Sequence, residues 1–403
     1  MRRVVVTGLG MINALGSDAK SSFKAICEGQ CGVDKITLFD ASDFPVQIAA
    51  QVKNFEPERY IEDAKEIKKL DRFIQLAHAA SDEAIKDANL KDYDIDDYGV
   101  SSAAGIGGLP NIEKNSNICL ERGARKISPF FIPSALVNML GGVLSIKYKL
   151  RGPNISSVTA CAASTHAIIE AAKTIMLGEA TGMLVIGAES TICPVGIGGF
   201  AAMKALSTRN DEPATASRPF DKGRDGFVMG EGAGALMLEE YESAKARGAK
   251  IYAEIIGFGE TGDAHHITSP SQDGPQRAIL RALKMAGNPK IDYINAHGTS
   301  TPANDKNETA TLKAVFGDNV PPISSIKGQI GHCLGAAGAI EAVSTLLAME
   351  QGILPPTINQ FEKDEDCDLD YVPNKARKMS INVAMSENFG FGGTNGVVIF
   401  KKV

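Results

Sequence analysis

The chain contains one short pattern twice, and this repetition limits the folds that it can adopt. Residues 155–159 read Ile-Ser-Ser-Val-Thr and residues 323–327 read Ile-Ser-Ser-Ile-Lys. Each β-branched run leads into small residues and then an alanine-rich segment with helical spacing, in which Ile-Glu-Ala recurs at 169–171 and 340–342. The sequence therefore predicts an α/β fold made of two duplicated halves, with the second half beginning near Ile251.

The overall composition is typical of a folded α/β enzyme. The 403 residues exceed the size of one ordinary core, and 44% of them are hydrophobic against 22% charged. No run of 18 consecutive apolar residues occurs, so we expect no membrane span. The net charge of −6 argues against a general affinity for nucleic acid.

The cysteines and the first glycines argue against bound metals and cofactors. The seven cysteines are odd in number and scattered, and the close pair Cys27 and Cys31 lacks a second pair at zinc-ligand spacing. We therefore expect no disulfide framework, no metal and a reducing, cytoplasmic location. Gly8 and Gly10 follow a predicted strand, but Asn13 replaces the third glycine of a dinucleotide fingerprint, so no such cofactor is expected.

Hydrophobic spacing predicts the other elements of the chain. One helix is predicted over 60–88, another around 133–147 and a short one at 241–248. The glycine-rich stretch 191–225 is predicted to be a long irregular loop system. Strands are predicted at 3–7, 98–102, 155–159, 183–186, 233–239, 292–295 and 396–401.

Cys161 lies where a predicted strand turns into a predicted helix. The free N–H groups of a helix's first turn favour a thiolate and can donate to an oxyanion that forms beside the sulfur. Small neighbours from Ala160 to Ser164 leave room for a substrate. A buried structural cysteine is the competing interpretation, since free cysteine behaves as a small hydrophobe.

Three residues of the second half favour the catalytic interpretation. His297 and His332 each follow a predicted strand among small residues, and Lys327 ends another strand. Together with a glycine-rich loop around Phe391 they predict one shared site with Cys161. A metal centre would need a third ligand in these segments, and a cysteine protease would use one histidine with an Asn or Asp.

Short motifs are spread over nearly the whole chain, namely Val4–Gly10, Thr159–Cys161, Arg218–Asp221, Asn295–Pro302, Lys327, Gly331–His332, Gly335–Gly338 and Asn388–Asn395. Together these motifs resemble the β-ketoacyl-acyl-carrier-protein synthases of bacterial type II fatty acid synthesis, and the synthase II branch most closely. That resemblance implies a thiolase fold with five layers in the order αβαβα. It also implies that residues 1–250 carry Cys161 and that residues 251–403 carry His297, Lys327 and His332.

The resemblance implies a decarboxylative Claisen condensation that lengthens an acyl chain by two carbons. Cys161 would take the acyl group from acyl carrier protein, and malonyl-carrier-protein would then lose CO2 and attack the thioester. The imidazoles of His297 and His332 would stabilise the enolate, and the backbone N–H groups of Cys161 and Phe391 would form an oxyanion hole. Phe391 would also act as a gate.

Further residues take supporting roles by the same resemblance. Lys327 would keep His332 neutral, with Glu341 and Asp305 as counter-charges. Gly328 departs from the family, where serine commonly follows the lysine. The expected partners are acyl carrier protein and a second copy of the chain. Substrate contacts are implied for Ile106, Phe200, Thr268, Thr299, Thr301 and Phe389, and carrier-protein docking for Lys65, Lys68, Lys69, Arg125, Lys126 and Arg209.

Three other activities remain open on the sequence. A synthase I activity would use the same residues. A biosynthetic thiolase would be expected to use a second cysteine near the C-terminus, but Cys333 and Cys367 fall outside the glycine-rich closing motif. A catalytically silent carrier-protein-binding subunit should lack the nucleophile, whereas Cys161 is present.

Overall fold

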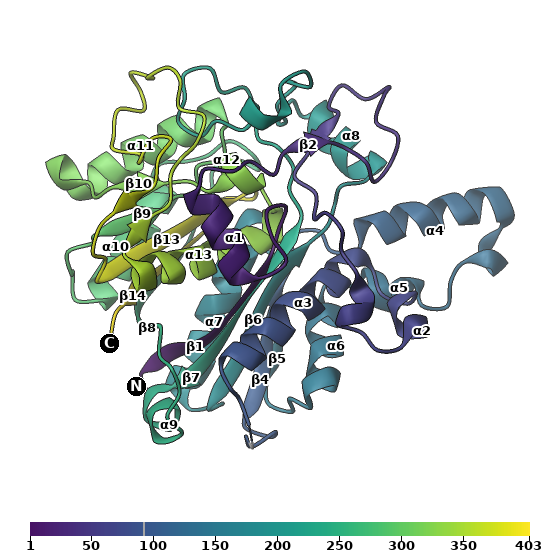
Figure 1. Ribbon diagram of the computed structural model, residues 1–403, viewed down its shortest axis with the longest axis horizontal. Coiled ribbons are helices and arrows are strands. Elements are labelled where there is room, and N and C mark those ends of the chain that lie inside the picture. Colours follow the sequence, from purple (N-terminus) through teal and green to yellow (C-terminus); the bar gives the residue numbers. More distant parts are fainter. Residues whose placement is uncertain (92) are drawn as a thin grey trace.

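The computed structural model describes residues 1–91 and 93–403 and is built around a ten-stranded mixed sheet (Figure 1). The strands follow one another in the order β10-β9-β13-β14-β8-β1-β7-β6-β4-β5. Their bounds are β1 (Val4–Ile12), β4 (Tyr98–Ala103), β5 (Asn154–Ser157), β6 (Gly182–Glu189), β7 (Gly232–Glu240), β8 (Ala253–Gly262), β9 (Tyr293–Asn295), β10 (Ile323–Ser324), β13 (Val383–Gly390) and β14 (Thr394–Lys401). Two further two-stranded sheets lie outside the large sheet. One pairs β2 (Asp34–Lys35) with β3 (Ile48–Ala49), and the other pairs β11 (Ile353–Leu354) with β12 (Arg377–Lys378).

The sheet consists of two halves with the same connectivity, as the repeated pattern predicts. The order β5-β4-β6-β7-β1 in one half corresponds to β10-β9-β13-β14-β8 in the other. In both halves the first three of these strands are parallel and the last pairings are antiparallel. The halves join where β1 pairs with β8, at Val5 with Glu254 and Val6 with Ala253.

Helices cover both faces of each half and give the five-layered αβαβα arrangement. The central layer is α7 (Ala163–Leu177) and α13 (Ala337–Gln351), which contact each other and strands of both halves. Every residue of α13 from Ala337 to Met349 is buried, which explains why this helix lacks a polar face. The outer layers are α3 (Arg72–Asp87) and α6 (Asn138–Tyr148) on one side and α10 (Asp273–Met285) and α11 (Pro302–Phe316) on the other.

The remaining helices lie around this core. The longest of them, α4, extends away from the body of the protein in Figure 1, and of its residues only Asn115 is buried. These helices are α1 (Ala19–Cys27), α2 (Ala64–Ile67), α4 (Leu109–Arg122), α5 (Phe131–Ala135), α8 (Pro194–Ala202), α9 (Tyr241–Ala246) and α12 (Lys327–Ile330). Among the described residues, no helix combines the length and apolar character needed to cross a bilayer.

Glycines bring the outer helices into direct contact with the sheet, in the same way in both halves. A Cβ at Gly10 in β1 would lie 1.9 Å from the carbonyl oxygen of Ala80 in α3. A Cβ at Gly259 in β8 would lie 1.9 Å from the carbonyl oxygen of Ala278 in α10. The Gly8-Leu-Gly10 motif therefore serves helix–sheet packing, which agrees with the rejection of a dinucleotide fingerprint.

The structure corrects two predicted helices. Residues 60–88 form α2 and α3 with a break between them, because Asp71 caps α3 by accepting a hydrogen bond from the N–H of Phe73. The region 133–147 is likewise divided into α5 and α6. The carbonyl of Ala135 at this break accepts a hydrogen bond from the N–H of Gly108 instead of continuing a helix.

The predicted loop system at 191–225 contains a helix that the sequence analysis missed. Pro194 occupies the first turn of α8, a position that proline favours, and the helix includes the glycines of Gly196-Ile-Gly-Gly199. Gly196 lies against the carbonyl of Thr191, where a Cβ would approach to 2.1 Å. Gly196 therefore permits close packing, and the low helix propensity of the three glycines concealed the helix.

The glycine contact in β1 predicts a specific loss of stability. Gly10→Ala should lower the free energy of unfolding by about 1–3 kcal/mol, because the methyl group forces β1 and α3 apart. Gly142→Ala in α6 is the control, since its Cβ would have its nearest contact at 3.8 Å and alanine favours a helix. Thermal unfolding of both variants tests this. Equal melting temperatures for the two variants would contradict the packing role.

Candidate active site

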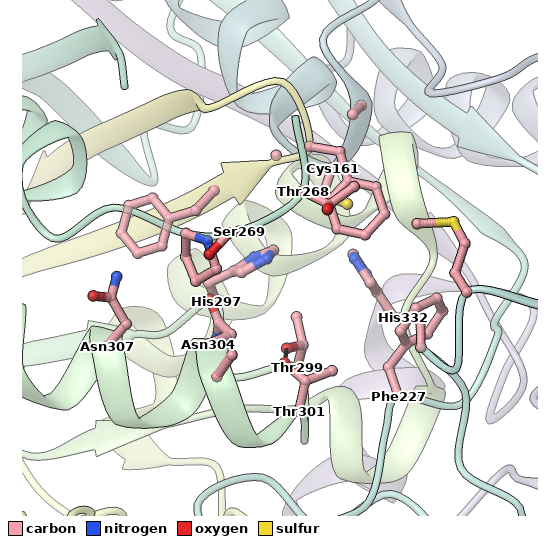
Figure 2. Close-up of a pocket in the computed structure, with 18 of the residues that line it drawn as sticks. Cys161, Phe227, Thr268, Ser269, His297, Thr299, Thr301, Asn304, Asn307 and His332 are labelled. Atoms are coloured by element: carbon pink, nitrogen blue, oxygen red, sulfur yellow. Dashed lines mark hydrogen bonds between the residues drawn. The ribbon is translucent and has the colours of Figure 1, made fainter. Parts of the chain in front are cut away.

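A cavity of about 620 Å³ is lined by residues of both halves of the chain (Figure 2). Cys161 comes from the turn before α7, whereas His297 follows β9 and His332 follows α12. Figure 2 shows the two imidazoles and the Cys161 sulfur around one space. Ten residues selected from the sequence line it, namely Cys161, His297, His332, Phe391, Ile106, Phe200, Thr268, Thr299, Thr301 and Phe389.

Cys161 sits in a tight turn directly before the helix, as predicted. A 3-10 turn, η3 (Ala160–Ala162), leads into α7, and Ala160 adopts a left-handed backbone conformation with φ of 51°. Only 8% of Cys161 is exposed. The carbonyl of Thr159 accepts a hydrogen bond of 3.0 Å from the hydroxyl of Thr394, which ties this turn to the last hairpin.

The surroundings of Cys161 favour the protonated thiol in the free site, whereas the sequence predicts that the start of the helix favours the thiolate. Burial raises the pKa of Cys161 to about 12, because a buried thiolate loses its hydration. Lys327 and hydrogen bonds from the backbone N–H groups of Phe391 and Cys161 act in the opposite direction. Two backbone N–H groups therefore favour the thiolate, although burial outweighs them in the free site.

The two imidazoles are buried and lack partners for most of their nitrogens. The rings of His297 and His332 are 5.5 Å apart, centre to centre, with an interplanar angle of 86°. Among the described residues, neither nitrogen of His332 has a hydrogen-bond partner, and neither has Nδ1 of His297. Since buried polar atoms are normally paired, these nitrogens are available to a molecule that enters the cavity.

Both imidazoles are uncharged at neutral pH. Burial lowers the pKa of His297 and of His332 well below the ordinary value, and the nearby cation of Lys327 lowers both further. Lys327 does not line the cavity. Its side chain is 1% exposed, and its ammonium group donates a hydrogen bond of 2.6 Å to the carbonyl of His297 and forms an ion pair with Glu341. Asn388 donates to the other oxygen of Glu341 at 2.6 Å.

Asp305 lies with a different cation from the one expected. It is fully buried, accepts a hydrogen bond of 2.8 Å from the N–H of Phe220 and faces Arg224 at 3.6 Å, whereas Glu341 is the residue that pairs with Lys327. The expectation that Asp305 is a counter-charge of Lys327 is therefore wrong, because Asp305 is instead a counter-charge of Arg224.

Glu308 is a supporting residue that the sequence analysis missed. Its carboxylate accepts hydrogen bonds from the N–H groups of His297 at 2.6 Å and Gly298 at 2.8 Å, and it is 1% exposed. It thereby fixes the backbone that carries His297. Its spacing of three residues from Asp305 in the segment after Pro302 was the available signal, since residues three apart share one face if that segment is a helix.

Side chains at the entrance extend the cavity beyond the predicted set. The hydroxyls of Thr299 and Thr301 are 2.9 Å apart, and Asn304 and Asn307 follow on α11 (Figure 2). The ring of Phe227 packs edge-on against His332, with 5.3 Å between ring centres. These further residues come from loops and from one helix end, and no motif marks them in the sequence.

Phe391 belongs to the short turn between β13 and β14. It is 38% exposed, and Gly392 and Gly393 after it have φ values of 82° and 69°. Two backbone hydrogen bonds connect this turn to a neighbouring loop, from Gly392 N–H to the carbonyl of Ile267 at 2.7 Å and from Asp263 N–H to that of Gly393 at 2.9 Å. Glycine is required at these positive φ values to avoid strain.

The basic residues selected from the sequence differ in their environments. Lys65, Lys68, Arg125 and Lys126 are exposed and lie outside the cavity, while Lys69 pairs with Glu66 and lies over the ring of Phe130 at 4.7 Å. Because α2 is only one turn long, the three lysines do not share one long helix.

One selected basic residue is engaged within the protein, and another was missed. The guanidinium of Arg209 donates a hydrogen bond of 2.7 Å to the carbonyl of Gly223 and lies 3.7 Å from Asp225. Lys204, by contrast, is exposed and lines the cavity entrance, and among the described residues it forms no ion pair.

Family models match most of the chain, and full-length relatives match all of it. The model for the β-ketoacyl synthase N-terminal domain matches residues 1–244 and that for the C-terminal domain matches residues 252–361. The chain is 51% identical over 410 residues to 3-oxoacyl-[acyl-carrier-protein] synthase 2 of Coxiella burnetii, covering 100% of this chain and 99% of that protein. It is 48% identical over 409 residues to the protein of the same name from Synechocystis, covering 100% and 98%.

Solved structures lead to the same family. A β-ketoacyl synthase from Burkholderia phymatum superimposes with a TM-score of 0.94 at 37% identity, covering 100% of both chains. A ketosynthase solved with a type II polyketide acyl-carrier protein and bound to the hexaketide gives a TM-score of 0.91 at 35% identity, covering 100% of this chain and 99% of that one. On the matched domains, the full-length relatives and the shared five-layered fold, the chain belongs to the β-ketoacyl synthase family.

Proposed function

We propose that this chain is a β-ketoacyl-acyl-carrier-protein synthase II, which condenses malonyl-carrier-protein with an acyl group held on Cys161. The observation that carries the proposal is the cavity itself, in which one thiol faces two uncharged imidazoles with unpaired nitrogens. The names of the full-length relatives support the same reaction.

In the first step the Cys161 sulfur attacks the thioester carbonyl of the acyl-carrier-protein. The S–C bond to the carrier breaks, a new S–C bond forms on Cys161, and the thiol proton ends on the released carrier thiol. Negative charge develops on the carbonyl oxygen, which the backbone N–H groups of Cys161 and Phe391 stabilise, since both already lower the pKa of the Cys161 thiol in the free site.

In the second step the malonyl group loses CO2. The electrons of the broken C–C bond move into an enolate, whose oxygen accepts hydrogen bonds from N–H groups of His297 and His332. The enolate carbon then attacks the thioester on Cys161, a C–C bond forms and the cysteine sulfur leaves as a thiolate, which takes up a proton from solvent to restore the thiol. Neutral imidazoles suit this role, because each keeps one donor without burying an extra positive charge.

Lys327 acts on this site from behind the cavity wall. Its ammonium group is occupied by Glu341 and by the carbonyl of His297, so it is not placed to remove a proton from substrate. Its charge adds to the burial that lowers the pKa of both imidazoles, and its hydrogen bond helps to hold His297 in place.

The remaining lining residues are assigned to the two arms of the substrate. Ile106 and Phe200 belong to the apolar group beside Cys161 and are proposed to hold the acyl chain. The polar entrance is proposed to hold the pantetheine arm. Its residues are Thr268, Thr299, Thr301 and Phe389.

The division of labour between the halves and the association of two copies are also proposed. Residues 1–250 supply the nucleophile, and residues 251–403 supply His297, Lys327 and His332.

A homodimer is supported by β5, which ends the sheet and leaves an edge to be covered. It is further supported by exposed apolar side chains on α5, α6 and the end of β5, namely Ile132, Ile146 and Val158. Seven free cysteines fit a cytoplasmic location.

The assignment of the two histidines predicts a separation of half-reactions. His297→Ala and His332→Ala should each still accept an acyl group on Cys161 but release CO2 from malonyl-carrier-protein about 10²- to 10³-fold more slowly, because a donor to the enolate is lost. Acylation is followed by mass spectrometry and CO2 by a coupled assay. The exposed His265→Ala is the control. Normal CO2 release in both cavity variants would refute the assignment.

The exposed cations are proposed to bind the acidic carrier protein. Lys65, Lys68, Arg125 and Lys126 form the outer part of this patch, and Lys204 at the cavity entrance replaces Arg209 in it, because the Arg209 side chain is held by Gly223 and Asp225. Such rim charges act mainly on association rate and salt dependence.

Reversing part of this patch should affect carrier-linked substrates alone. The double variant Lys65→Glu with Lys68→Glu should raise KM for acyl-carrier-protein about tenfold, corresponding to about 1.4 kcal/mol. It should leave a small acyl-pantetheine thioester unaffected. Lys245→Glu with Lys284→Glu provides the same charge change on exposed positions of α9 and α10. If the double variant loses activity equally toward acyl-carrier-protein and toward the small thioester, the patch is not a docking site.

Phe391 is proposed to gate the order of the two steps. The glycines after it allow the turn to change its backbone, and movement would require the hydrogen bonds to Ile267 and Asp263 to break. An acyl chain can open the gate only if it binds the open form better, since equal affinity shifts no population.

Removing the Phe391 ring should allow decarboxylation to occur before Cys161 is acylated. Phe391→Ala should decarboxylate malonyl-carrier-protein without prior acylation more readily than the wild type, because the free cavity is no longer blocked. Phe361→Ala, which removes an exposed ring outside the cavity, should behave as wild type. Rates of CO2 release with and without acyl donor test the gate. An unchanged premature rate in Phe391→Ala would exclude it.

A further inference from the structure

Glu189 is a buried carboxylate that the mechanism above does not use. It ends β6, is 0% exposed and, within residues 1–91 and 93–403, forms no ion pair. Its oxygens instead accept hydrogen bonds from four backbone N–H groups. These are Gly105 at 2.5 Å, Gly107 at 3.0 Å, Gly335 at 3.1 Å and Ile106 at 3.2 Å.

The topology explains why these groups meet at one carboxylate. β4 and β6 are parallel neighbours with Ala103 opposite Gly187, so Gly105, which follows β4, and Glu189, the last residue of β6, lie at the same ends of the two strands. Gly335 comes from the other half, in the 3-10 turn η6 (Leu334–Ala336). Successive N–H groups in such loops form an anion-binding concavity, which here holds a side chain of the protein itself.

Close backbone packing at this point requires glycine. A Cβ at Gly335 would lie 2.0 Å from the N–H nitrogen of Gly105, and a Cβ at Gly105 would lie 2.8 Å from the Glu189 carboxylate. The two segments are therefore in contact over the carboxylate and cannot separate without breaking its hydrogen bonds.

The opposite side of these segments faces the cavity. Gly105, Ile106 and Leu334 line it beside Cys161, and His332 lies two residues before Leu334. Glu189 thus lies behind the wall on which the acyl chain is proposed to rest, and it joins that wall to the segment that carries His332.

We propose that Glu189 is a positioning residue that sets the acyl chain-length preference by fixing the wall at Ile106 against the turn at Leu334. The inference rests on the assignment of the cavity as the acyl site. A carboxylate offers enough lone pairs for all four N–H groups, whereas an amide has a single acceptor oxygen and would turn its NH2 group toward some of these donors. Glu189→Gln should therefore break some of the hydrogen bonds that hold residues 105–107, so that the cavity wall at Ile106 is fixed less firmly.

The test compares acylation of Cys161 by palmitoyl- and hexanoyl-carrier-protein. In Glu189→Gln the ratio of kcat/KM for palmitoyl over hexanoyl should fall at least about tenfold, because the longer chain contacts more of the wall and small changes in an apolar pocket alter selectivity by about 10- to 200-fold. A loss of folded protein alone would lower both values equally and leave the ratio unchanged.

Glu239→Gln is the matched control. Glu239 is also 0% exposed and lies opposite Gly182, at the other end of β6, where it accepts hydrogen bonds from Tyr98 and Arg247. It does not line the cavity. This variant should lose stability but keep the wild-type ratio. An unchanged ratio in Glu189→Gln, or the same change in Glu239→Gln, would overturn the inference.

Two further measurements cover the case in which Glu189→Gln does not fold. Glu189→Asp keeps the charge but shortens the reach, so it should show a smaller change of the ratio in the same direction. In the wild type, hydrogen exchange of the amides of residues 105–107 should be slow, and fast exchange would overturn the inference. If wild-type Cys161 accepts no acyl group at all, the proposed function fails instead.

Discussion

The buried ion pair between Lys327 and Glu341 is the interaction on which the site most depends. Both side chains are 1% exposed, and burying two charges is costly unless their remaining hydrogen-bonding groups are satisfied. The carbonyl of His297 and the amide of Asn388 provide those partners. The pair thereby links α12, α13, β13 and the His297 loop, and its positive end adds to the burial that lowers the pKa of the two imidazoles.

The five-layered fold explains how this pair can be buried so deeply. The central helices α7 and α13 lie between two halves of one sheet, so their residues have protein on every side. Cys161 precedes one of these helices and Glu341 lies on the other. The duplication therefore brings the nucleophile of one half against the imidazoles of the other at the ends of two equivalent strand–helix units.

The sequence allowed the fold and the central residues to be predicted because their signals are local. Repeated β-branched and alanine-rich segments revealed the duplication, and Cys161, His297, His332 and Phe391 lie in small-residue motifs after strands. The long-range partners could not be predicted. Nothing local in the sequence shows that Arg224 pairs with Asp305 or that Gly335 reaches Glu189, since these contacts depend on how distant loops pack. The helix breaks near Asp71 and Ala135 were missed because capping and loop contacts outweighed hydrophobic spacing.

Covalent labelling of the protein by its acyl donor tests the central claim most directly. The full-length protein is incubated with acyl-carrier-protein, digested and mapped by mass spectrometry, and Cys161→Ala is treated in parallel. Of the seven cysteines, Cys161 alone lines the cavity between the two imidazoles, so a single acylated peptide containing Cys161 is expected. The variant should carry no acyl group and should not elongate. An acyl group on another cysteine, or elongation by Cys161→Ala, would contradict the account.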